Sequence, residues 1–456
     1  MSDPLLLPEL RGMLLENDAA GLKEFCEVLH PATAADNLAE LSPTDFWKVL
    51  SCTNLNRQVE IFEYVGAGRQ RQFVADVDRQ HLTALLEEMA PDDRADLLES
   101  LDPDQLEALL PLIAQAERSE IRKLLSYPDD SAGSVMTTEY ASLPEDITVR
   151  EAINQLRLQA PNRETIYYVY VLDEGRRLRG FITLRKLILA RPETLLSQII
   201  ERDVISVRVD DDRELVANKM ARYDFIAIPV VDEQNRLVGI ITHDDVLDVL
   251  QKEATEDVHR MGAVDPFDEN YLEASFILIW RKRAAWLSCL FVAELLTYTA
   301  LGRYEHAIKA VVVLSLFVPL CISTGGNSGS QAATLITRAM TLGQVKVSDW
   351  WRVVRHELAM GLALGLTLGC IGFLRGYFTS PEKLDGADRM TLAIVIAQST
   401  ATICLWGTLV GAVLPILFRR VGVDPAIASS PFVATFVDVT GIVIYFNVAY
   451  AHGLIT

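Results

Sequence analysis

Asp438 is the residue whose position says most about chemistry, because it lies in the middle of a membrane-length apolar stretch, 432–446. A carboxylate at that depth costs roughly 3 kcal/mol or more unless it faces water, a partner or a cation. The apolar segments of the chain offer it no obvious basic partner. Small and hydroxyl residues surround it at helical spacing, and they let other backbones approach and carbonyl oxygens face a channel: Ala434, Thr435, Thr440 and Gly441.

A second apolar stretch, 319–331, carries glycines and polar residues where a spanning helix is expected. Gly325 and Gly326 predict an interruption of that helix, and Asn327 and Gln331 add amide side chains. An unpaired acid and an interrupted helix in one bundle indicate a cation pathway.

A site built from one carboxylate, amide side chains and backbone carbonyls suits a hard cation, because all of its ligands are oxygen atoms. Mg²⁺ dehydrates reluctantly and is bound through one or two carboxylates, whereas Ca²⁺ takes a larger cage of oxygen ligands. The sequence therefore ranks Mg²⁺ first and leaves Mn²⁺, Co²⁺ and Ca²⁺ as alternatives.

The elements that position these residues follow from a sharp division of charge along the chain, which has 456 residues and a net charge of −20. Residues 1–282 carry 30 Lys+Arg and 53 Asp+Glu, a net of −23, whereas residues 283–456 carry 12 and 9, a net of +3. We expect an acidic soluble front, which repels nucleic acid and concentrates cations, and a membrane-embedded back.

Cysteines and histidines are scattered without a C-x-x-C or H-x-x-x-H pair. This pattern excludes a disulfide framework and a thiolate metal site, and it argues against soft-metal chemistry.

Five segments are long enough to span a bilayer: 284–302, 306–324, 352–374, 390–418 and 430–454. The stretch that begins at Met1 lacks the basic region and long apolar core of a secretory signal, so we expect the front to be cytoplasmic and the protein to be a multi-pass protein of the inner (plasma) membrane. Nine basic residues then fall on the cytoplasmic side, among them Arg281, Lys282 and Arg283, against five on the other side, in agreement with the positive-inside rule.

The first 130 residues repeat a signature in which a proline opens a run of apolar residues at helical spacing, at Pro31, Pro43, Pro91 and Pro103. Proline is favoured in the first turn of a helix, so the pattern predicts short stacked helices of the solenoid type. Asp92 and Asp96 stand four residues apart on one helix face. They are either a solvated helix start favoured by the helix dipole or cation ligands.

Residues 131–250 contain an internal duplication. Asp173, Gly180 and Thr183 recur as Asp232, Gly239 and Thr242, each 59 positions later. Each copy predicts strand, Asp turn, strand and helix. The segment resembles a tandem pair of CBS domains, at about 136–195 and 200–250, and such pairs dimerise and often sense adenosine nucleotides or ions.

Residues 244–282 predict a long charged helix that enters the membrane. Its acids recur on neighbouring turns, where like charges cost roughly 0.2–0.5 kcal/mol each: Asp245, Asp248, Glu253, Glu256 and Asp257. Either this is a solvated helix face, or a divalent cation bridges these acids to carboxylates elsewhere, for which Asp92, Asp96 and Asp224 are the candidates.

Along nearly its whole length the chain resembles the MgtE-type magnesium channels and transporters, most specifically in the stretches 325–334, 422–431 and 436–441. The resemblance implies a multidomain, mostly α-helical polytopic membrane protein. Its parts would be an acidic helical N-terminal regulatory domain (1–130), a tandem α/β CBS pair (131–250), a connecting or plug helix (251–282) and a five-helix pore domain (283–456).

The resemblance also implies a homodimer with its pore at the two-fold axis. Asp438 of both subunits would hold a largely hydrated Mg²⁺, in a site shaped by neighbouring residues: Gly325, Gly326, Asn327, Gln331 and Thr435. Intracellular Mg²⁺ would close the pore by binding among cytoplasmic acids: Asp92, Asp96, Asp224, Asp245, Asp248, Glu253, Glu256, Asp257 and Asp424. ATP binding by the CBS pair is a further possibility of the family.

Two other functions compete with a channel. Residues 326–329 fit the G-x-S-G pattern of rhomboid-type intramembrane serine proteases, but Ser328 would need a histidine base, and all three histidines of the membrane part lie near predicted segment ends. An ion-coupled exchanger would use Glu294 or Glu357 as a relay. We expect a transport protein and not an enzyme.

Overall fold

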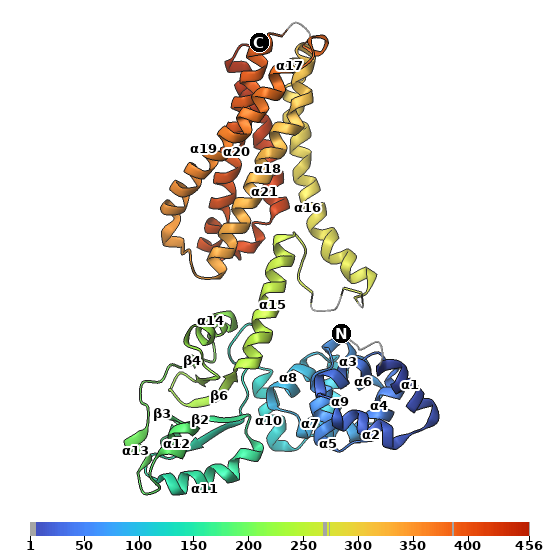
Figure 1. Ribbon diagram of the computed structural model, residues 1–456, viewed down its shortest axis with the longest axis vertical. Helices are drawn as coiled ribbons and strands as arrows, with labels where there is room; N and C mark the ends of the chain where they lie inside the picture. The colour runs from blue at the N-terminus through green and yellow to red at the C-terminus, as the bar shows by residue number, and fades with distance from the viewer. Residues whose placement is uncertain (1–5, 268–270, 273, 385–386, 456) are drawn as a thin grey trace. The chain divides into compact units, whose positions relative to one another are not determined.

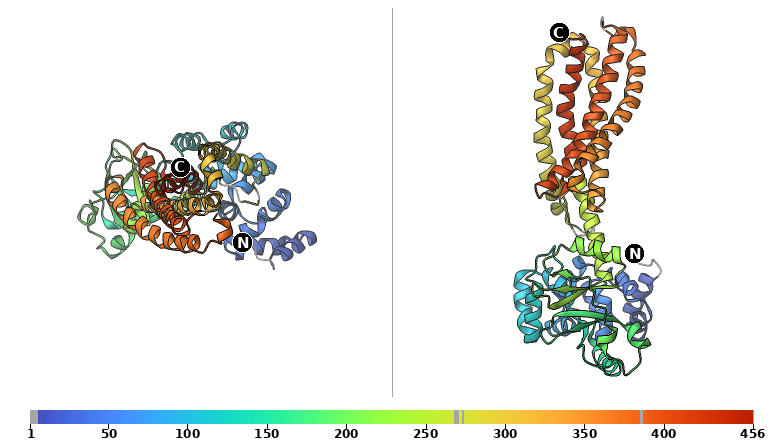
Figure 2. Two further views of the ribbon diagram at one scale, coloured as in Figure 1. Left: turned by 90° about the horizontal axis from the view of Figure 1, so that it is seen from above. Right: turned by 90° about the vertical axis from the view of Figure 1, so that its left-hand side faces the viewer.

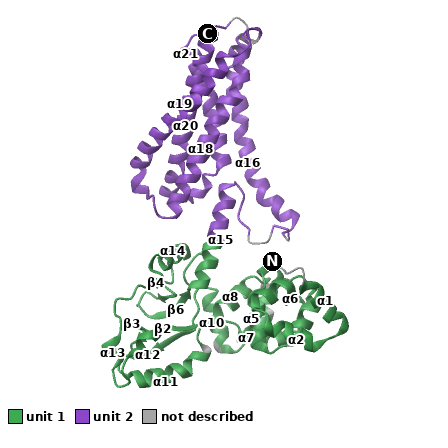
Figure 3. Cartoon of the chain, in the orientation of Figure 1, with its two compact units in different colours: residues 1–251 green, residues 252–456 purple. Residues whose placement is uncertain are grey.

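The computed structural model describes residues 6–267, 271–272, 274–384 and 387–455. It divides into two compact units, Met1–Gln251 and Lys252–Thr456 (Figure 3). The first five residues, part of the stretch in which no secretory signal was expected, lie outside the described residues.

The N-terminal part of the first unit consists of short helices around one hydrophobic core, as predicted (Figure 1). Helices α3, α4, α8 and α9 begin at the four prolines of the signature, where the missing N–H is not needed by the helix. The elements are α1 (Leu6–Glu16), α2 (Ala19–Val28), α3 (Pro31–Leu38), α4 (Pro43–Leu50), α5 (Leu55–Glu63), α6 (Ala67–Asp76), α7 (Arg79–Glu88), α8 (Pro91–Glu99), α9 (Pro103–Leu109), the 3₁₀ turn η1 (Leu110–Leu112) and α10 (Gln115–Leu124).

The duplicated segment forms two three-stranded sheets of identical topology. In each sheet the first strand is parallel to the second and the second antiparallel to the third, and the pairs Tyr168 with Thr183 and Ala227 with Thr242 preserve the offset of 59. The elements are β1 (Tyr140–Leu143), α11 (Val149–Gln159), η2 (Ala160–Asn162), β2 (Thr165–Leu172), β3 (Leu178–Thr183), α12 (Leu184–Leu189), α13 (Leu196–Ile199), β4 (Val207–Arg208), α14 (Arg213–Tyr223), β5 (Ala227–Val231) and β6 (Leu237–Thr242).

The connecting helix is shorter than predicted. Helix α15 (His243–Met261) ends well before residue 282, and the described residues between it and the first membrane helix are not helical. Ala263 adopts a left-handed conformation with φ 56°, and the N–H of Val264 donates to the carbonyl of His259 at 2.9 Å. This is the hydrogen-bond pattern of a helix C-cap, and Pro266 disfavours helical geometry at the residue before it. The prediction of one continuous helix over 244–282 was therefore wrong.

Five helices of the described residues are long and apolar enough to cross a membrane. Together with short connecting elements they form the second unit, where the right-hand view of Figure 2 shows them running alongside one another. The elements are α16 (Phe276–Arg303), α17 (Glu305–Ala310), α18 (Val312–Thr341), η3 (Val347–Asp349), α19 (Trp350–Tyr377), η4 (Pro381–Lys383), α20 (Arg389–Arg420), η5 (Pro425–Ile427) and α21 (Ser430–Ala451).

The predicted interruption at Gly325 and Gly326 is absent, because α18 runs as one helix from Val312 to Thr341 with Pro319 inside it. The glycines serve close packing instead. A Cβ atom on Gly407 would overlap the carbonyl oxygen of Gly325, and one on Gly411 would overlap that of Gly329. Helices α18 and α20 therefore approach each other at backbone distance, which small residues permit in membrane bundles.

We expect Gly411→Ala to destabilise the membrane domain by about 1–3 kcal/mol or more, because the added methyl group has no room between the two helix backbones. The thermal midpoint of the purified protein measures this effect. The matched control is Gly302→Ala on α16, where a Cβ atom would meet nothing within 4 Å. Equal midpoints for the two variants would contradict the packing argument.

Candidate functional site

The carboxylate of Asp438 lies on α21 beside Gly326 of α18. A Cβ atom on Gly326 would lie 3.6 Å from Asp438 Oδ1, so glycine leaves the space in front of the acid open. Asp438 is half-buried. Within the described residues its carboxylate has no hydrogen-bond donor and no basic partner. The structure thus retains the unpaired acid that the sequence predicted.

One face of α18 next to this acid is polar and exposed. Asn327, Gln331 and Thr334 are exposed and Thr324 is partly exposed, at intervals of three and four residues along a helix of membrane-spanning length. Amide and hydroxyl groups are costly against lipid chains. This polar face therefore requires water, ions or another protein surface in front of it.

The remaining pore candidates have different surroundings. Gly325 is buried between α20 and α21, where a Cβ atom would meet Ile403 and, at 2.8 Å, Val437, so its close neighbours are side chains of the bundle. Thr435 is half-buried on α21. Glu294 of α16 is exposed and close enough to Asp438 to interact with it electrostatically.

The hydroxyl of Ser328 is engaged with the backbone rather than with a base. It is buried and lies 3.1 Å from both the Gly325 and the Cys404 carbonyl oxygens. The ring of His452 is hydrogen-bonded to Gln398, and that of His356 to Glu357 at 3.2 Å. These contacts remove the support for a serine protease site.

Glu357, the second candidate relay of an exchanger, is buried on α19 and 9% exposed. Its described partner is the ring of His356. Because α19 packs mainly against α20, this acid belongs to a different contact from the one that holds Asp438.

A cluster of acids, which we call the α8 cluster, forms within the first unit where the helical domain meets the duplicated one. It consists of Glu63, Asp92, Asp93, Glu164 and Asp245, each of which either raises the pKa of another member or has its own pKa raised by one. The neighbouring cation, Arg94, is buried and turned toward Glu117 and Glu120 of α10, at 3.6 and 3.8 Å. The α8 cluster is therefore a concentration of uncompensated negative charge.

The pKa values of the α8 cluster are raised. Burial, followed by repulsion from Asp245, holds the pKa of Asp92 well above its usual range, and Asp92 Oδ1 is buried without a hydrogen-bond partner among the described residues. Although Asp93 is exposed to solvent, the surrounding protein and repulsion from Glu63 raise its pKa to about 8. Burial raises the pKa of Glu63 to about 7 and, with repulsion from Asp245, that of Glu164 to about 6. A cation placed here would relieve this repulsion.

Two of the predicted acids of the first unit lie at the margin of this cluster and one lies apart. Asp96 acts electrostatically on Asp93, and Asp248 lies one turn after Asp245 on α15. Asp224 is exposed in a left-handed conformation at the end of α14, and no contact described in the structure joins it to the cluster.

A second group of acids, the α15–η5 group, lies within the second unit. Asp257 of α15 accepts a hydrogen bond from Thr341 Oγ1 at 3.3 Å, and burial and then repulsion from Asp424 raise its pKa. Glu253 contributes to the same repulsion. Arg260 pairs with Glu256 at 3.0 Å and also with Asp424, so a guanidinium lies between α15 and η5, among acids that the family resemblance implies as ligands of regulatory Mg²⁺.

Within the described residues no three Asp, Glu, His or Cys side chains lie close enough together to chelate one ion directly. The sequence analysis missed Glu63, Asp93, Glu164 and Arg260. Asp93 adjoins Asp92, and Arg260 stands four residues after Glu256, a spacing that pairs opposite charges on a helix, so both could have been included. Glu63 and Glu164 are distant in sequence from the acids they meet and carry no local signal.

We expect acidification to favour the contact between the helical and duplicated domains even without Mg²⁺. Because contact raises the pKa values of these carboxyls, the docked arrangement binds more protons than the undocked one. Its stability is lowest above about pH 8, where Asp93 is ionised, and rises as the pH falls through about 7 and 6, where Glu63 and Glu164 take up protons.

Hydrogen exchange of α8 and the first turn of α15, corrected for intrinsic rates, measures this dependence. Protection should increase from pH 8 to pH 6 in the wild type, and the increase should shrink in a variant with Asp93→Asn and Glu164→Gln. Protection that is flat or decreases over that range contradicts the electrostatic interpretation.

Comparison with known families gives three matches that together cover most of the chain. The MgtE family, described as divalent cation transporters, matches residues 318–448. The MgtE intracellular N domain matches residues 29–130, and the CBS domain matches twice, at 132–193 and 196–252.

Individual relatives agree. The chain is 41% identical over 447 residues to a magnesium transporter MgtE of Thermus thermophilus, covering 97% of this chain and 98% of that protein. It is 37% identical to a magnesium transporter MgtE of Enterococcus faecalis, over 73% of this chain and 71% of the relative.

Two solved structures resemble the soluble part. One is the soluble part of a magnesium transporter, with 35% identity and a TM-score of 0.52, covering 54% of this chain and 98% of the other. The second is the cytosolic domain of the Mg²⁺ channel MgtE in complex with ATP, with 39% identity and a TM-score of 0.51, covering 53% and 99%.

Proposed function

The chain belongs to the MgtE family of divalent cation transporters, and from that premise we propose that it conducts Mg²⁺ through a pore at Asp438 and closes when intracellular Mg²⁺ binds its acidic domains. The observation that carries the proposal is the unpaired Asp438 carboxylate in front of Gly326, beside the exposed polar face of α18. A hydrated dication satisfies the acid, the amides and the hydroxyls together, because Mg²⁺ retains its waters and is held through few carboxylates.

The polar face of α18 also favours a second copy of the chain as the partner across the pore. In a single bundle, Asn327 and Gln331 would face lipid, which costs free energy because their amide groups find no hydrogen-bond partners there. Facing a water-filled path removes that cost. In a homodimer the Asp438 carboxylates of both subunits face one ion, and their two negative charges balance the two positive charges of Mg²⁺. We infer that the pore lies on the two-fold axis and that the acidic domains face the cytoplasm from the inner membrane.

The membrane potential alone suffices to drive uptake. Each charge that crosses an inside-negative membrane gains about 2.3 kcal/mol per 100 mV, so a dication gains about 4.6 kcal/mol. This corresponds to roughly three decades of accumulation. A passive pore therefore needs a gate, and the transported ion itself is the natural closing signal.

The two acidic groups supply that gate in our proposal. Mg²⁺ that enters the α8 cluster, retaining its waters, offsets the repulsion among Asp92, Asp93 and Asp245 and stabilises the docked domain. In the α15–η5 group, Arg260 already joins Glu256 to Asp424, while Asp257 is repelled by Asp424 and Glu253 more than Arg338 offsets, so an ion can neutralise the remainder. Closure then requires the ion mainly where repulsion among the acids exceeds the attraction of nearby arginines.

ATP is the second regulator that we propose, on the basis of the ATP complex of the solved relative. Corresponding positions of the two repeats fit a nucleotide, with Thr183 and Lys186 in the first and Thr242 and Asp245 in the second. The ammonium group suits a phosphate, and the carboxylate suits ribose hydroxyls. Equilibrium dialysis with labelled ATP should show binding that Lys186→Ala weakens, and equal binding by both proteins would remove this assignment.

Uptake by reconstituted liposomes tests the proposed function. With an inside-negative potential and no gradient of sodium or protons, we expect Mg²⁺ to enter in proportion to the voltage. Uptake that occurs only with a coupling-ion gradient would favour an exchanger that uses Glu294 or Glu357, and the absence of uptake under both conditions would reject transport through this chain.

A further inference from the structure

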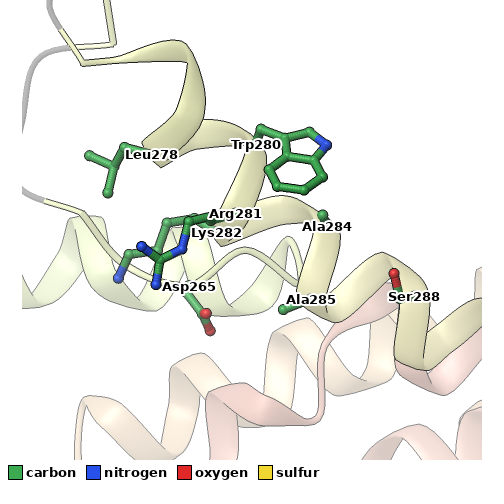
Figure 4. Close-up of a pocket in the computed structure, with 8 residues that line it drawn as sticks. All are labelled: Asp265, Leu278, Trp280, Arg281, Lys282, Ala284, Ala285 and Ser288. Carbon is green, nitrogen blue, oxygen red and sulfur yellow. The ribbon is translucent and has the colours of Figure 1, made fainter.

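A pocket of about 590 Å³ lies at the start of α16, formed by residues that neither the pore nor the acidic groups use. Arg281, Lys282 and Trp280 line it together with Ser288 of the same helix and Asp265 of the preceding segment (Figure 4). The N–H of Asp265 donates to the carbonyl of Lys282 at 3.4 Å, which fixes the segment against the helix.

The charges of the pocket complement a phosphodiester. Two cations and one carboxylate leave a net charge of +1, and Figure 4 shows Arg281 and Lys282 side by side near Asp265. A guanidinium presents parallel N–H donors that match two phosphate oxygens, and an ammonium adds a compact charge. Asp265 can accept a hydrogen bond from a hydroxyl or ammonium group on the same ligand.

The pocket lies at the membrane boundary. Arg281, Lys282 and Arg283 come directly before the apolar part of the first candidate membrane span. Trp280 is 60% exposed, and tryptophan is enriched at the level of lipid head groups. A ligand with a phosphate at this depth has its apolar part in the bilayer.

An apolar stripe continues from the pocket along α16. Ala284 and Ser288 line the pocket, and Leu287, Phe291 and Leu295 follow at intervals of four residues with 54%, 68% and 53% of their surfaces exposed. Only 6% of the apolar window of α16 is buried in the chain, the lowest share among the five candidate spans of the described residues. Acyl chains of a lipid would cover this stripe below a head group in the pocket.

We propose that this pocket binds an anionic glycerophospholipid of the membrane. The phosphodiester is held by Arg281 and Lys282, Asp265 accepts a hydrogen bond from the rest of the head group, and the acyl chains lie along Leu287, Phe291 and Leu295. The site joins the segment that follows α15 to the first membrane helix, so bound lipid stabilises the link between the connecting helix and the pore domain.

Thermal unfolding of the full-length purified protein, washed free of lipid in detergent, tests the proposal. Three probes are titrated: phosphatidylglycerol, phosphatidylcholine and free glycerol phosphate. We expect a saturable rise of the midpoint with phosphatidylglycerol, a much smaller one with phosphatidylcholine and none with glycerol phosphate. The last probe carries the phosphate chemistry without a membrane anchor.

The variants locate the site. Removing one cation near a lipid surface lowers affinity roughly fivefold, so Arg281→Gln with Lys282→Gln should weaken the response to phosphatidylglycerol about thirtyfold. The matched control is Arg283→Gln, which removes the adjacent cation that does not line the pocket. The comparison is with the single variant Arg281→Gln, which also removes one charge: Arg283→Gln should weaken the response at least about fivefold less than Arg281→Gln does.

Three results would overturn the proposal. Equal loss in Arg283→Gln and Arg281→Gln, which remove one charge each, would mean diffuse attraction rather than a pocket. Saturable binding of glycerol phosphate would mean a soluble phosphate ligand. The third result combines two measurements: lipid does not change the thermal midpoint of the wild type, and the double variant has a different oligomeric mass. The apolar stripe of α16 would then be an interface between copies of the chain. If the double variant fails to fold, the three-probe comparison on the wild type still tests lipid binding. The variant Lys282→Arg, which keeps the positive charge, should then retain binding.

Discussion

Replacement of Asp438 by Asn should reduce Mg²⁺ uptake by about a hundredfold or more. Asn keeps the shape of the side chain and removes its charge, so packing beside Gly326 is preserved while the attraction for the ion is lost. At an effective dielectric constant of about 20, a unit charge a few ångströms from a dication contributes several kcal/mol. A loss of about 3 kcal/mol already corresponds to a hundredfold change in rate or occupancy.

The measurement is uptake of Mg²⁺ by a transport-deficient cell and by liposomes, for the wild type, Asp438→Asn and Asp438→Ala at equal protein amounts. The matched control is Asp388→Asn, the same chemical change at a carboxylate that caps α20 outside the apolar segment. Asp388→Asn should conduct as the wild type does. Full uptake by Asp438→Asn would mean that the ion takes another path.

Neutralising the acidic groups should leave the pore open at internal Mg²⁺ concentrations that close the wild type. The double variant Asp92→Asn with Asp245→Asn removes two of the charges that bind the ion in the α8 cluster. It also removes the repulsion between these two acids, which by itself would favour the closed state. Attraction between a dication and two carboxylates exceeds the mutual repulsion of the carboxylates at similar distances, because the ion carries twice the charge and lies between them. The balance therefore favours loss of the closed state.

Recordings from inside-out patches at rising Mg²⁺ distinguish three outcomes. The double variant should need at least about tenfold more Mg²⁺ to close, and Asp257→Asn should shift the response in the same direction through the α15–η5 group. The exposed Asp203→Asn should leave it unchanged. A double variant that is closed without Mg²⁺ would mean that relief of repulsion alone closes the pore. An unaltered response would remove these acids from the gate.

Arg260 illustrates why the gate could not be read fully from the sequence. The spacing of Glu253, Glu256 and Asp257 on one helix was visible, and the match to an MgtE-like stretch suggested Asp424 as their counterpart. Only the tertiary structure shows that Arg260 pairs with Glu256 and Asp424 together. A contact over 164 residues of chain leaves no periodic or local signal.

At Gly325 and Gly326 the sequence predicted a helix break that the structure does not contain. Two adjacent glycines inside an apolar segment predict a break, because glycine lowers helix propensity by about 1 kcal/mol relative to alanine. Packing against α20 and α21 outweighs that cost, and it uses the missing side chains as the contact surface. The prediction was wrong because propensity is a local quantity and the contact is not.

What the sequence by itself determined was each property set by neighbours along the chain. These include the proline-started helices, the repeat with an offset of 59, the five apolar spans and a lone carboxylate at membrane depth. What only the tertiary structure decided was which distant groups meet: Glu63 beside Asp93, Glu164 beside Asp92, Gly326 beside Asp438, and the course of α18 through its glycines. The physical reason is that helix caps, hydrophobic periodicity and the cost of burying charge act within a few residues, whereas pairing and close packing depend on the path of the whole chain.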